Sequence, residues 1–491
     1  MGFWDVLLFN IASVLGPRWI AAAAHAGPSS ISLWILAALF FFVPTGLVIS
    51  ELSTRFPNEG GLYVWSKEAF GDFHGFVAGW SYWVYTFFYF PGLLLASASM
   101  AAYVGGAAFG HLAQDRFFLL CVSFLLLFIA VGLNLVGLRV GKWLQNLGGI
   151  GTYIPLLMLI TCAFAVWTMR DTATHFSFSS ILPVWNWDTV NFWSQIAFAF
   201  TGLELVSAMS DEIHDPKRTI PAAILGSGVL IMFVYILGTI ALLILMPAGE
   251  VDAKSGVFQA LTVGFGSMGL GMMGMLAALV AAVGNAGGIG STVAGISRIP
   301  FVVGVDRYLP AAFGKIHPRW RTPYVSILVQ AGISGTILLL SQINETTTSS
   351  YQILVDAAII LYFIPFLYMY AAVIKLAYRP DRATAPRTVL VPGGKLGVWL
   401  CGGLGFLVTL ASIIFSMVPP GETADKVLFE VKLLGGSGLV ILIGLFLYWN
   451  GARAKRQEVF IRESMEREAR NRESRISIRR SRIADRDRDS E

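Results

Sequence analysis

The chain has 491 residues, of which 56% are hydrophobic and 13% are charged, and its formal net charge is +5. This composition is far more apolar than that of a soluble globular domain, so it excludes a soluble enzyme. Most of the net positive charge lies in residues 451–491, where basic and acidic side chains are interleaved, so the charge does not indicate nucleic-acid binding.

Apolar runs of about 20 residues, the length needed to cross a bilayer, recur along almost the whole chain. The fold class we predict is an all-α integral membrane protein, with one transmembrane domain over residues 1–450 and a charged cytoplasmic tail over residues 451–491. We expect twelve transmembrane helices, near 3–24, 30–53, 75–106, 116–137, 143–169, 189–210, 219–246, 268–297, 323–341, 351–378, 396–418 and 430–450.

Basic residues in the loops predict the orientation, because Lys and Arg are concentrated in cytoplasmic loops. Loops that follow even-numbered helices hold most of them, beginning with Arg55 and Lys67. Loops that follow odd-numbered helices hold only Arg116, Arg170, Lys254, Lys426 and Lys432. We therefore expect a multi-pass protein of the cell membrane with both termini in the cytoplasm.

The first predicted helix is interrupted. Its apolar sequence contains Asn10, Ser13, Gly16, Pro17 and Arg18. Pro17 removes a backbone donor and disrupts the preceding turn, and Gly16 tolerates an unwound backbone. This pattern predicts a discontinuous helix.

The sixth predicted helix is interrupted as well. Thr201 and Gly202 lie near its middle, the carboxyl group of Glu204 follows, and the chain leaves the apolar zone through the charged segment 211–218. Freed backbone groups at bilayer depth have no water to bind, and an ionisable residue there indicates a functional site. Because burial favours the neutral form of a carboxyl group, Glu204 is either a proton-coupling group or a structural one that never titrates.

The two interruptions occupy matching positions, in the first helices of two five-helix halves. Transporters built from inverted repeats place their discontinuous helices in these positions. Such helices expose N–H groups that suit a carboxylate and carbonyl groups that suit an ammonium group or a cation. An amino acid carries both groups, so the pattern predicts a substrate site. The alternative is that each interruption is a packing kink.

No motif for catalysis, for a cofactor or for a transition metal occurs in the sequence. The three Cys and six His are dispersed, and the chain contains neither H-E-x-x-H, nor a P-loop, nor G-x-S-x-G. We expect no catalytic residues and no cofactor. Ser291 and Thr292, with Asn285 on the same predicted helix, either supply oxygens to a sodium-type site or bond back to their own helix.

Three stretches of the chain resemble the amino acid–polyamine–organocation (APC) superfamily, and the resemblance extends over about residues 3–450. The first is E-L-S-T-R-F-P-N-E-G-G-L-Y-V-W-S-K-E-A-F-G at 51–71. The second is A-F-T-G-L-E at 199–204, followed by D-E-I-H-D-P-K-R-T-I-P at 211–221. The third begins S-R-I-P-F-V-V-G-V-D-R-Y-L-P and covers 297–323.

The resemblance implies a LeuT-type fold and secondary transport of amino acids or related amines. This fold contains a 5+5 inverted repeat, with repeats near 3–169 and 189–378, and two peripheral helices near 396–450.

The resemblance also implies roles for individual residues. The unwound segment that holds the substrate α-carboxylate aligns with Ser13, Val14, Leu15 and Gly16. The segment whose carbonyl groups receive the α-amine aligns with Phe198, Ala199, Phe200, Thr201 and Gly202. Phe198 is implied as an outer gate that covers the substrate, and Glu204 as the carboxyl group that reports protonation.

The sequence departs from the family pattern in two places. The first helix has S-V-L-G-P-R where members usually have Gly-Ser/Ala-Gly-Ile. The fifth helix lacks the lysine of proton-coupled cationic amino acid transporters and has Thr152 near that position.

The family pattern does not indicate a role for Arg18. A cation at this depth engages an acidic substrate and so biases selectivity, or pairs with a carboxylate, or extends towards the end of its helix. Asp356 in the tenth predicted helix is the candidate for pairing.

We expect a secondary active permease, not an enzyme, that moves amino acids across the cytoplasmic membrane by alternating access. Its partners are a small-molecule substrate, membrane lipid, and a proton or sodium as coupling ion, and it acts by proton-coupled symport or by amino acid exchange. One alternative is a polyamine or organic amine transporter of the same fold. Another is a non-transporting sensor or a membrane-embedded enzyme. The sequence does not indicate the oligomeric state.

Overall fold

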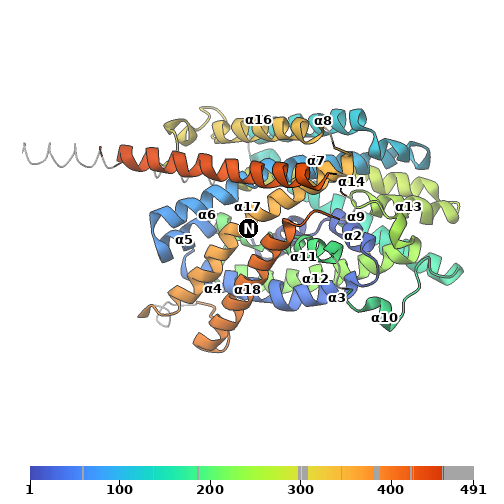
Figure 1. Cartoon of the computed structure of the whole chain (residues 1–491), viewed down its shortest axis with the longest axis horizontal. Coiled ribbons are helices and arrows are strands. Elements are labelled where there is room, and N and C mark those ends of the chain that lie inside the picture. Colours follow the sequence, from blue (N-terminus) through green and yellow to red (C-terminus); the bar gives the residue numbers. More distant parts are fainter. Residues whose placement is uncertain are drawn as a thin grey trace, which may run out of the picture.

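The computed structural model describes residues 1–57, 60–136, 138–184, 187–296, 300, 308–343, 345–380, 388–420, 423, 425–455 and 457. All regular structure in these residues is helical, and long helices lie side by side in one bundle (Figure 1).

In the first part of the chain the described residues form thirteen helical elements. They are α1 (Phe3–Val14), α2 (Pro17–His25), α3 (Ser30–Ala37), the π-helix η1 (Ala38–Phe42), α4 (Val43–Arg55), α5 (Leu62–Phe70), α6 (Asp72–Val84), α7 (Thr86–Ala101), the 3₁₀-helices η2 (Ala102–Gly105) and η3 (Ala107–Gln114), α8 (Arg116–Val136), α9 (Leu138–Met169) and α10 (Phe178–Ile181).

The second part continues in the same way. Its elements are α11 (Trp187–Ala199), η4 (Leu203–Glu212), α12 (Pro216–Leu245), η5 (Ala248–Glu250), α13 (Gly256–Ser267), α14 (Gly271–Ile296), η6 (Ala311–Gly314), α16 (Tyr324–Ser341), α17 (Thr347–Leu376), α18 (Gly394–Ser416) and a last helix, Lys426–Lys455.

The prediction of a multi-pass membrane protein is confirmed. Within the described residues, ten helices are long and apolar enough to cross a membrane, and the pair α1 and α2, bent by 41°, forms an eleventh span. The predicted run 189–210 is not among them, because its two parts, α11 and η4, have only 13 and 10 residues. Twelve spans are consistent with this arrangement.

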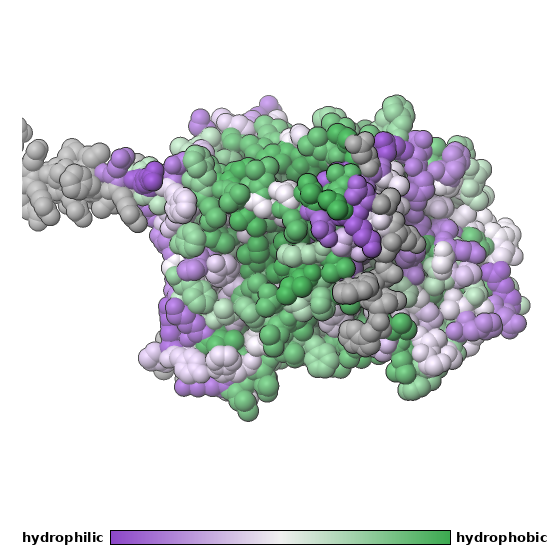
Figure 2. Space-filling view, in the orientation of Figure 1, coloured by the Kyte–Doolittle hydropathy of each residue, from purple (hydrophilic) through white to green (hydrophobic). Residues whose placement is uncertain are grey.

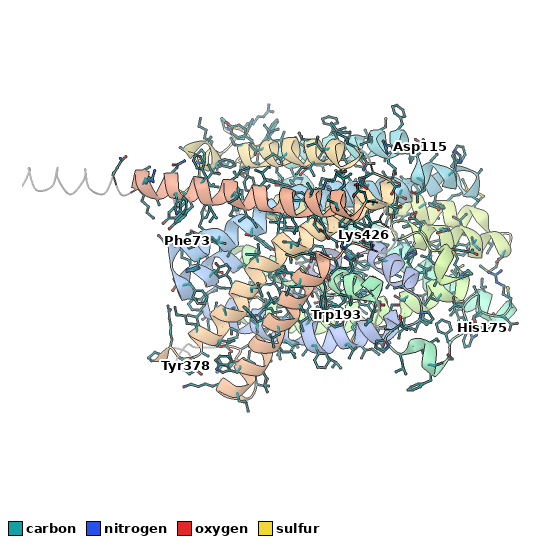
Figure 3. All side chains as sticks on the ribbon, viewed as in Figure 1. Phe73, Asp115, His175, Trp193, Tyr378 and Lys426 are labelled. Atoms are coloured by element: carbon teal, nitrogen blue, oxygen red, sulfur yellow. The ribbon has the colours of Figure 1, made fainter. Side chains whose placement is uncertain are left out.

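The surface of the bundle has the pattern of a membrane protein. Hydrophobic side chains gather over its middle, and most hydrophilic ones lie towards its two ends (Figure 2). Phe73 and Tyr378 lie towards one end, which we call the tail end because the last helix leads there (Figures 1 and 3). Asp115 and His175 lie towards the other, the far end (Figure 3). Two loops that follow even-numbered spans thus lie at the tail end, and two that follow odd-numbered spans lie at the far end.

The structure corrects the charged loop predicted at 211–218. The helix η4 continues to Glu212 and α12 already begins at Pro216, so only the residues between them form a turn. Asp215 in this turn has a left-handed backbone with φ of 48°. Proline at the first position of α12 explains the early start, because that position needs no backbone donor.

Small residues allow α9 and α14 to pack closely. Gly151 and Gly284 face each other, and a Cβ atom on either glycine would overlap with the Cα atom of the other. Membrane helices commonly approach through such small residues. The predicted fifth and eighth helices therefore form one tightly packed pair.

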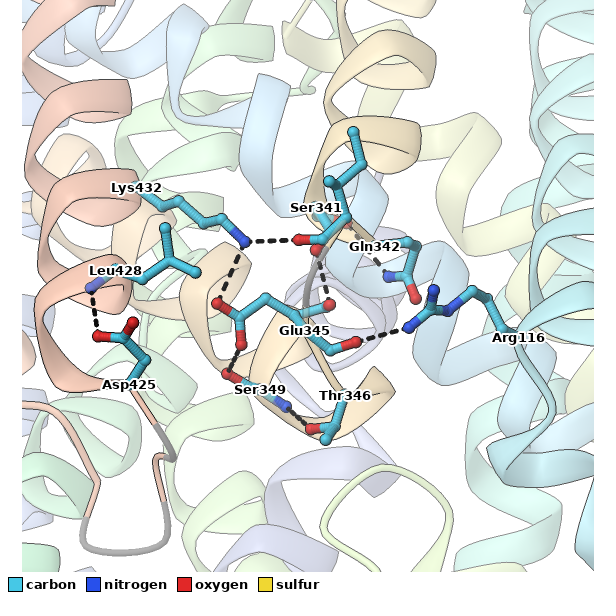
Figure 4. A network of polar contacts seen from close by, with 11 residues as sticks. Arg116, Ser341, Gln342, Glu345, Thr346, Ser349, Asp425, Leu428 and Lys432 are labelled. Carbon is cyan, nitrogen blue, oxygen red and sulfur yellow. Dashed lines mark hydrogen bonds and ion pairs between the residues drawn. The ribbon is translucent and has the colours of Figure 1, made fainter.

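A polar network ties the last helix to the loop between α16 and α17 (Figure 4). Lys432 forms an ion pair of 3.1 Å with Glu345, whose second carboxylate oxygen accepts a hydrogen bond from Ser349. Arg116, the first residue of α8, donates to the backbone carbonyl of Glu345. Partly exposed pairs of this kind contribute little stability, about 1 kcal/mol or less.

Candidate functional site

The first helix is discontinuous where the sequence predicts it. The helix α1 ends at Val14, Leu15 and Gly16 have extended backbones, and α2 begins at Pro17. No side chain caps the N-terminus of α2. Ser13 and Gly16 are half-buried although they lie near the middle of a spanning pair. This interruption therefore leaves helix ends that can bind a ligand.

The sixth span is interrupted after Ala199, the last residue of α11. Gly202 has φ of +116°, a conformation that L side chains rarely adopt. The hydroxyl of Thr201 donates to the Phe198 carbonyl at 2.7 Å, which closes the end of α11. The carbonyl oxygens of Phe200 and Thr201 accept no hydrogen bond from the described residues. Two acceptors are thus left free at this interruption.

The structure brings the two interruptions together. A Cβ atom on Gly202 would lie 3.2 Å from the carbonyl oxygen of Ser13, so only glycine permits this approach. The buried hydroxyl of Tyr235 in α12 lies 2.6 Å from the Val14 carbonyl and 3.0 Å from the Ala199 carbonyl. Tyr235 was not predicted as a site residue. The only feature of the sequence that could have indicated Tyr235 is its polar hydroxyl group within the apolar run 219–246.

The carboxyl group of Glu204 is bound by three donors. One oxygen accepts the backbone N–H of Gly202 at 3.0 Å. The other accepts the hydroxyl of Tyr82 at 2.8 Å and that of Tyr362. Glu204 is 2% exposed, and hydrogen bonds from three donors offset part of the cost of burying its charge. The carboxyl group thus fixes the interruption of the sixth span against α6 and α17.

Phe198 lies within a cluster of aromatic rings. Its ring centroid is 5.6 Å from that of Trp19 and 6.0 Å from that of Tyr89, both at edge-on angles. Its ring centroid is also 5.2 Å from that of Tyr362 and 6.1 Å from that of Phe363. Tyr362, which sequence reasoning missed, therefore contacts both Phe198 and the carboxyl group of Glu204.

Arg18 is buried at the start of α2, with 3% of its surface exposed. Its guanidinium carbon lies 4.3 Å from the ring centroid of Trp19 and 4.8 Å from that of Tyr89. Among the described residues no carboxylate is within ion-pair distance of it. Asp356, the partner considered from the sequence, instead accepts a hydrogen bond of 3.4 Å from Asn191.

The predicted sodium-type site stays a prediction. The side chains of Ser291 and Thr292 lie outside the described part of the structure. Asn285 on the same helix donates to the sulfur of Met100 at 3.5 Å. Thr152 bonds back to the Gly148 carbonyl of its own helix at 3.0 Å. No group of three or more His, Cys, Asp or Glu that could hold a metal was found in the described residues.

Comparisons with known proteins show the family of the chain. The family model "Amino acid permease" matches residues 1–437. The transporter lpg1691 of Legionella pneumophila is 29% identical over 91% of this chain and 96% of its own length. The "Probable agmatine/putrescine antiporter AguD" of Lactococcus lactis is 24% identical over 90% of this chain and 93% of its own.

A further relative and a solved structure are also similar to this chain. The "Serine/threonine exchanger SteT" of Bacillus subtilis is 26% identical over 71% of this chain and 77% of its own length. The crystal structure of MhsT in complex with L-phenylalanine has a TM-score of 0.60 and 14% identity, and it covers 84% of this chain and 97% of that one. At this identity the likeness to MhsT establishes the fold.

The bundle with two facing helix interruptions is a multi-pass membrane protein of the LeuT-type fold. The chain belongs to the amino acid permease family, as its resemblance to the APC superfamily predicted. It is therefore a membrane transporter of small molecules and not an enzyme.

Proposed function

We propose that this permease carries an amino acid across the cytoplasmic membrane by alternating access, with the substrate held between the two helix interruptions. The observation that carries the proposal is the contact of the interruptions, where Gly202 approaches Ser13 and the hydroxyl of Tyr235 bridges Val14 and Ala199. Exposed helix ends at the middle of a membrane bundle are the usual binding groups of such transporters.

Each interruption supplies one half of a zwitterion site. The N-terminus of α2, after Gly16 and Pro17, carries the positive end of a helix dipole and suits an α-carboxylate. The free carbonyl groups of Phe200 and Thr201 suit an α-ammonium group. The candidate substrate segments are therefore Ser13–Gly16 and Phe198–Gly202, as the family resemblance implies.

The proposal includes two gates, one on each side of the interruption. The chain enters α11 from the far end, so the Phe198 ring cluster lies on that side of the interruption. Glu204, bound to Tyr82 and Tyr362, follows the interruption towards the tail end. We assign Phe198 to an outer gate and Glu204 to the inner one, with Arg18 beside the outer gate.

The same proposal includes orientation and repeat organisation. The tail end faces the cytoplasm together with both termini, which is supported by the place of Phe73 and Tyr378, each next to a predicted cytoplasmic loop, at that end. The repeats cover about 3–169 and 189–378, and the peripheral helices about 396–450. Of the cytoplasmic tail at 451–491, the structure describes residues 451–455 and 457.

Coupling is either proton symport through Glu204 or exchange of one amino acid for another, with sodium near Ser291 and Thr292 as a further candidate ion. Names of relatives such as the serine/threonine exchanger and the agmatine/putrescine antiporter support exchange. The second of these names also supports the alternative of a polyamine or organic amine substrate.

Uptake by purified protein in proteoliposomes tests the proposal. Labelled amino acids and amines are offered to vesicles that are empty, loaded with the same unlabelled compound, or given a pH or sodium gradient. We expect uptake of at least one amino acid, and the condition that drives it identifies the coupling. If no amino acid or amine is taken up in any condition, the proposed function is wrong.

A further inference from the structure

Arg18 carries a buried charge for which the described residues provide no anion. Its guanidinium group contacts the rings of Trp19 and Tyr89, which stabilise a cation but accept few of its five N–H donors. The buried hydroxyl of Tyr351 lies beside Arg18 and can accept one of these donors, but a neutral hydroxyl does not balance the charge. A buried charge without an ionic partner is costly, so this arrangement points to an anion that comes from outside the chain.

The carboxyl groups that could pair with Arg18 are bound elsewhere. Glu204 accepts Tyr82, Tyr362 and the N–H of Gly202. Asp356 is fully buried and faces Asn191. Asp252 accepts the side chain of Gln114 and groups of its own loop. The charge of Arg18 is thus available to a ligand.

The position of Arg18 relates it to the proposed substrate site. It lies two residues after Gly16, on the first turn of α2. Both rings that it contacts, Trp19 and Tyr89, also contact Phe198, the residue that we assign to the outer gate. A substrate held at the interruptions would extend its side chain towards the aromatic and cationic wall formed by these residues.

We propose that Arg18 binds a second acidic group on the substrate, so that the permease selects amino acids with a carboxylate side chain. The inference rests on the proposed function, because it needs the substrate to lie between the interruptions. The backbone at the start of α2 would hold the α-carboxylate, and the planar guanidinium group would bind the side-chain carboxylate through two parallel hydrogen bonds.

The same charge disfavours cationic substrates. A buried guanidinium group repels a second positive charge more strongly than it would in water, because little solvent screens the interaction. Diamines such as putrescine have no carboxylate to offset this repulsion. The expected order of preference is therefore acidic, then neutral, then cationic compounds.

L-Glutamate and L-glutamine provide the test, since they have nearly the same shape and differ in side-chain charge. Uptake of each labelled compound is measured in proteoliposomes loaded with the same unlabelled compound. We expect wild type to prefer glutamate by about 10- to 100-fold in apparent affinity, the range for a charged hydrogen-bonded pair. Putrescine should not be taken up.

Variants assign the preference to the residue. Arg18→Gln should abolish the preference for glutamate, and Arg18→Lys, which keeps the charge but loses the planar donors, should retain part of it. Arg116→Gln removes an exposed arginine of the far end and should leave the preference unchanged. If Arg18→Gln does not fold, the comparison of glutamate with glutamine on wild type still decides the substrate class.

The outcomes separate this inference from the proposed function. Equal or better uptake of glutamine, or uptake of putrescine, overturns the acidic preference and leaves transport established. A preference for glutamate that persists in Arg18→Gln overturns the role of Arg18. Failure of wild type to take up any amino acid overturns the proposed function and this inference with it.

Discussion

The hydroxyl of Tyr235 lies 2.6 Å from the carbonyl oxygen of Val14, the last residue of α1. The carbonyl of Ala199, the last residue of α11, is 3.0 Å from the same hydroxyl. One proton is thus shared between the ends of two interrupted helices. A side chain of α12 therefore connects the two halves of the proposed substrate site, and this connection breaks if α1 and α11 move apart.

Tyr235→Phe removes the shared proton and leaves two buried carbonyl groups without this donor. We expect a loss of about 1–3 kcal/mol in stability, seen as a lower melting temperature in detergent, together with slower uptake. Tyr153→Phe is the matched control, because its hydroxyl bonds the Leu8 carbonyl of α1 away from the interruptions. Unchanged melting and uptake in Tyr235→Phe would show that the bridge is unimportant.

Gly202→Ala tests the close approach of the two interruptions. The backbone at φ of +116° is strained for alanine by about 1–3 kcal/mol. The added Cβ would also lie 3.2 Å from the Ser13 carbonyl and 3.3 Å from the Val14 side chain. We expect uptake to fall about tenfold or more. Gly332→Ala in α16, where a Cβ meets nothing within 4 Å, is the control. Normal uptake by Gly202→Ala contradicts the site geometry.

Glu204→Gln separates a coupling role from a structural one. The amide keeps an acceptor for the Gly202 N–H and turns its NH₂ group towards Tyr82 and Tyr362, whose hydroxyls rotate to accept it. We expect this variant to fold and to lose the pH dependence of uptake. Glu204→Ala leaves all three donors unbound and should unfold at a lower temperature. Uptake by Glu204→Gln with an unaltered pH profile would eliminate the proton-coupling role.

Lys254, in the loop before α13, gives a stability prediction. It is 1% exposed and donates to Gln114 and Thr347 at the far end. Burial lowers the pKa of Lys254 below its usual 10.5, and the charge of Asp252 opposes the shift. At pH values between the lowered pKa and 10.5, Lys254 is protonated in the unfolded chain but not in the folded one. The free energy of unfolding therefore rises with pH in this window.

Lys254→Met should therefore remove this rise, measured as melting temperature across buffers of increasing pH. Lys426→Met, which replaces an exposed lysine, is the control and should keep the rise. A pH profile of Lys254→Met that matches wild type would refute the assignment.

Much of the fold and part of the site follow from the sequence. Long apolar runs predict the spans, and Gly16, Pro17 and Gly202 predict both interruptions, because glycine and proline act on the local backbone. The segment 211–218 was predicted less well, since proline at the start of α12 extends that helix into a charged region.

Side-chain partners were harder to predict. The rotation of a helix about its axis is set by packing, which a single sequence does not encode locally. The contact of Tyr362 with Glu204 was therefore not predicted. Asp356 was considered as the partner of Arg18, whereas the guanidinium group lies against the ring of Tyr89. The same reason explains why the sequence did not indicate the contacts of Tyr82 with Glu204 and of Tyr89 with Phe198.

The central claim is that substrate lies between the two interruptions, and protection of a cysteine placed there tests it directly. Cys121, Cys162 and Cys401 are replaced by serine, and the labelling rate of Ser13→Cys by a small maleimide is measured. We predict that a transported amino acid slows labelling of Ser13→Cys but not of Ser267→Cys, an exposed position in α13. Equal labelling of Ser13→Cys with and without saturating substrate would contradict the account.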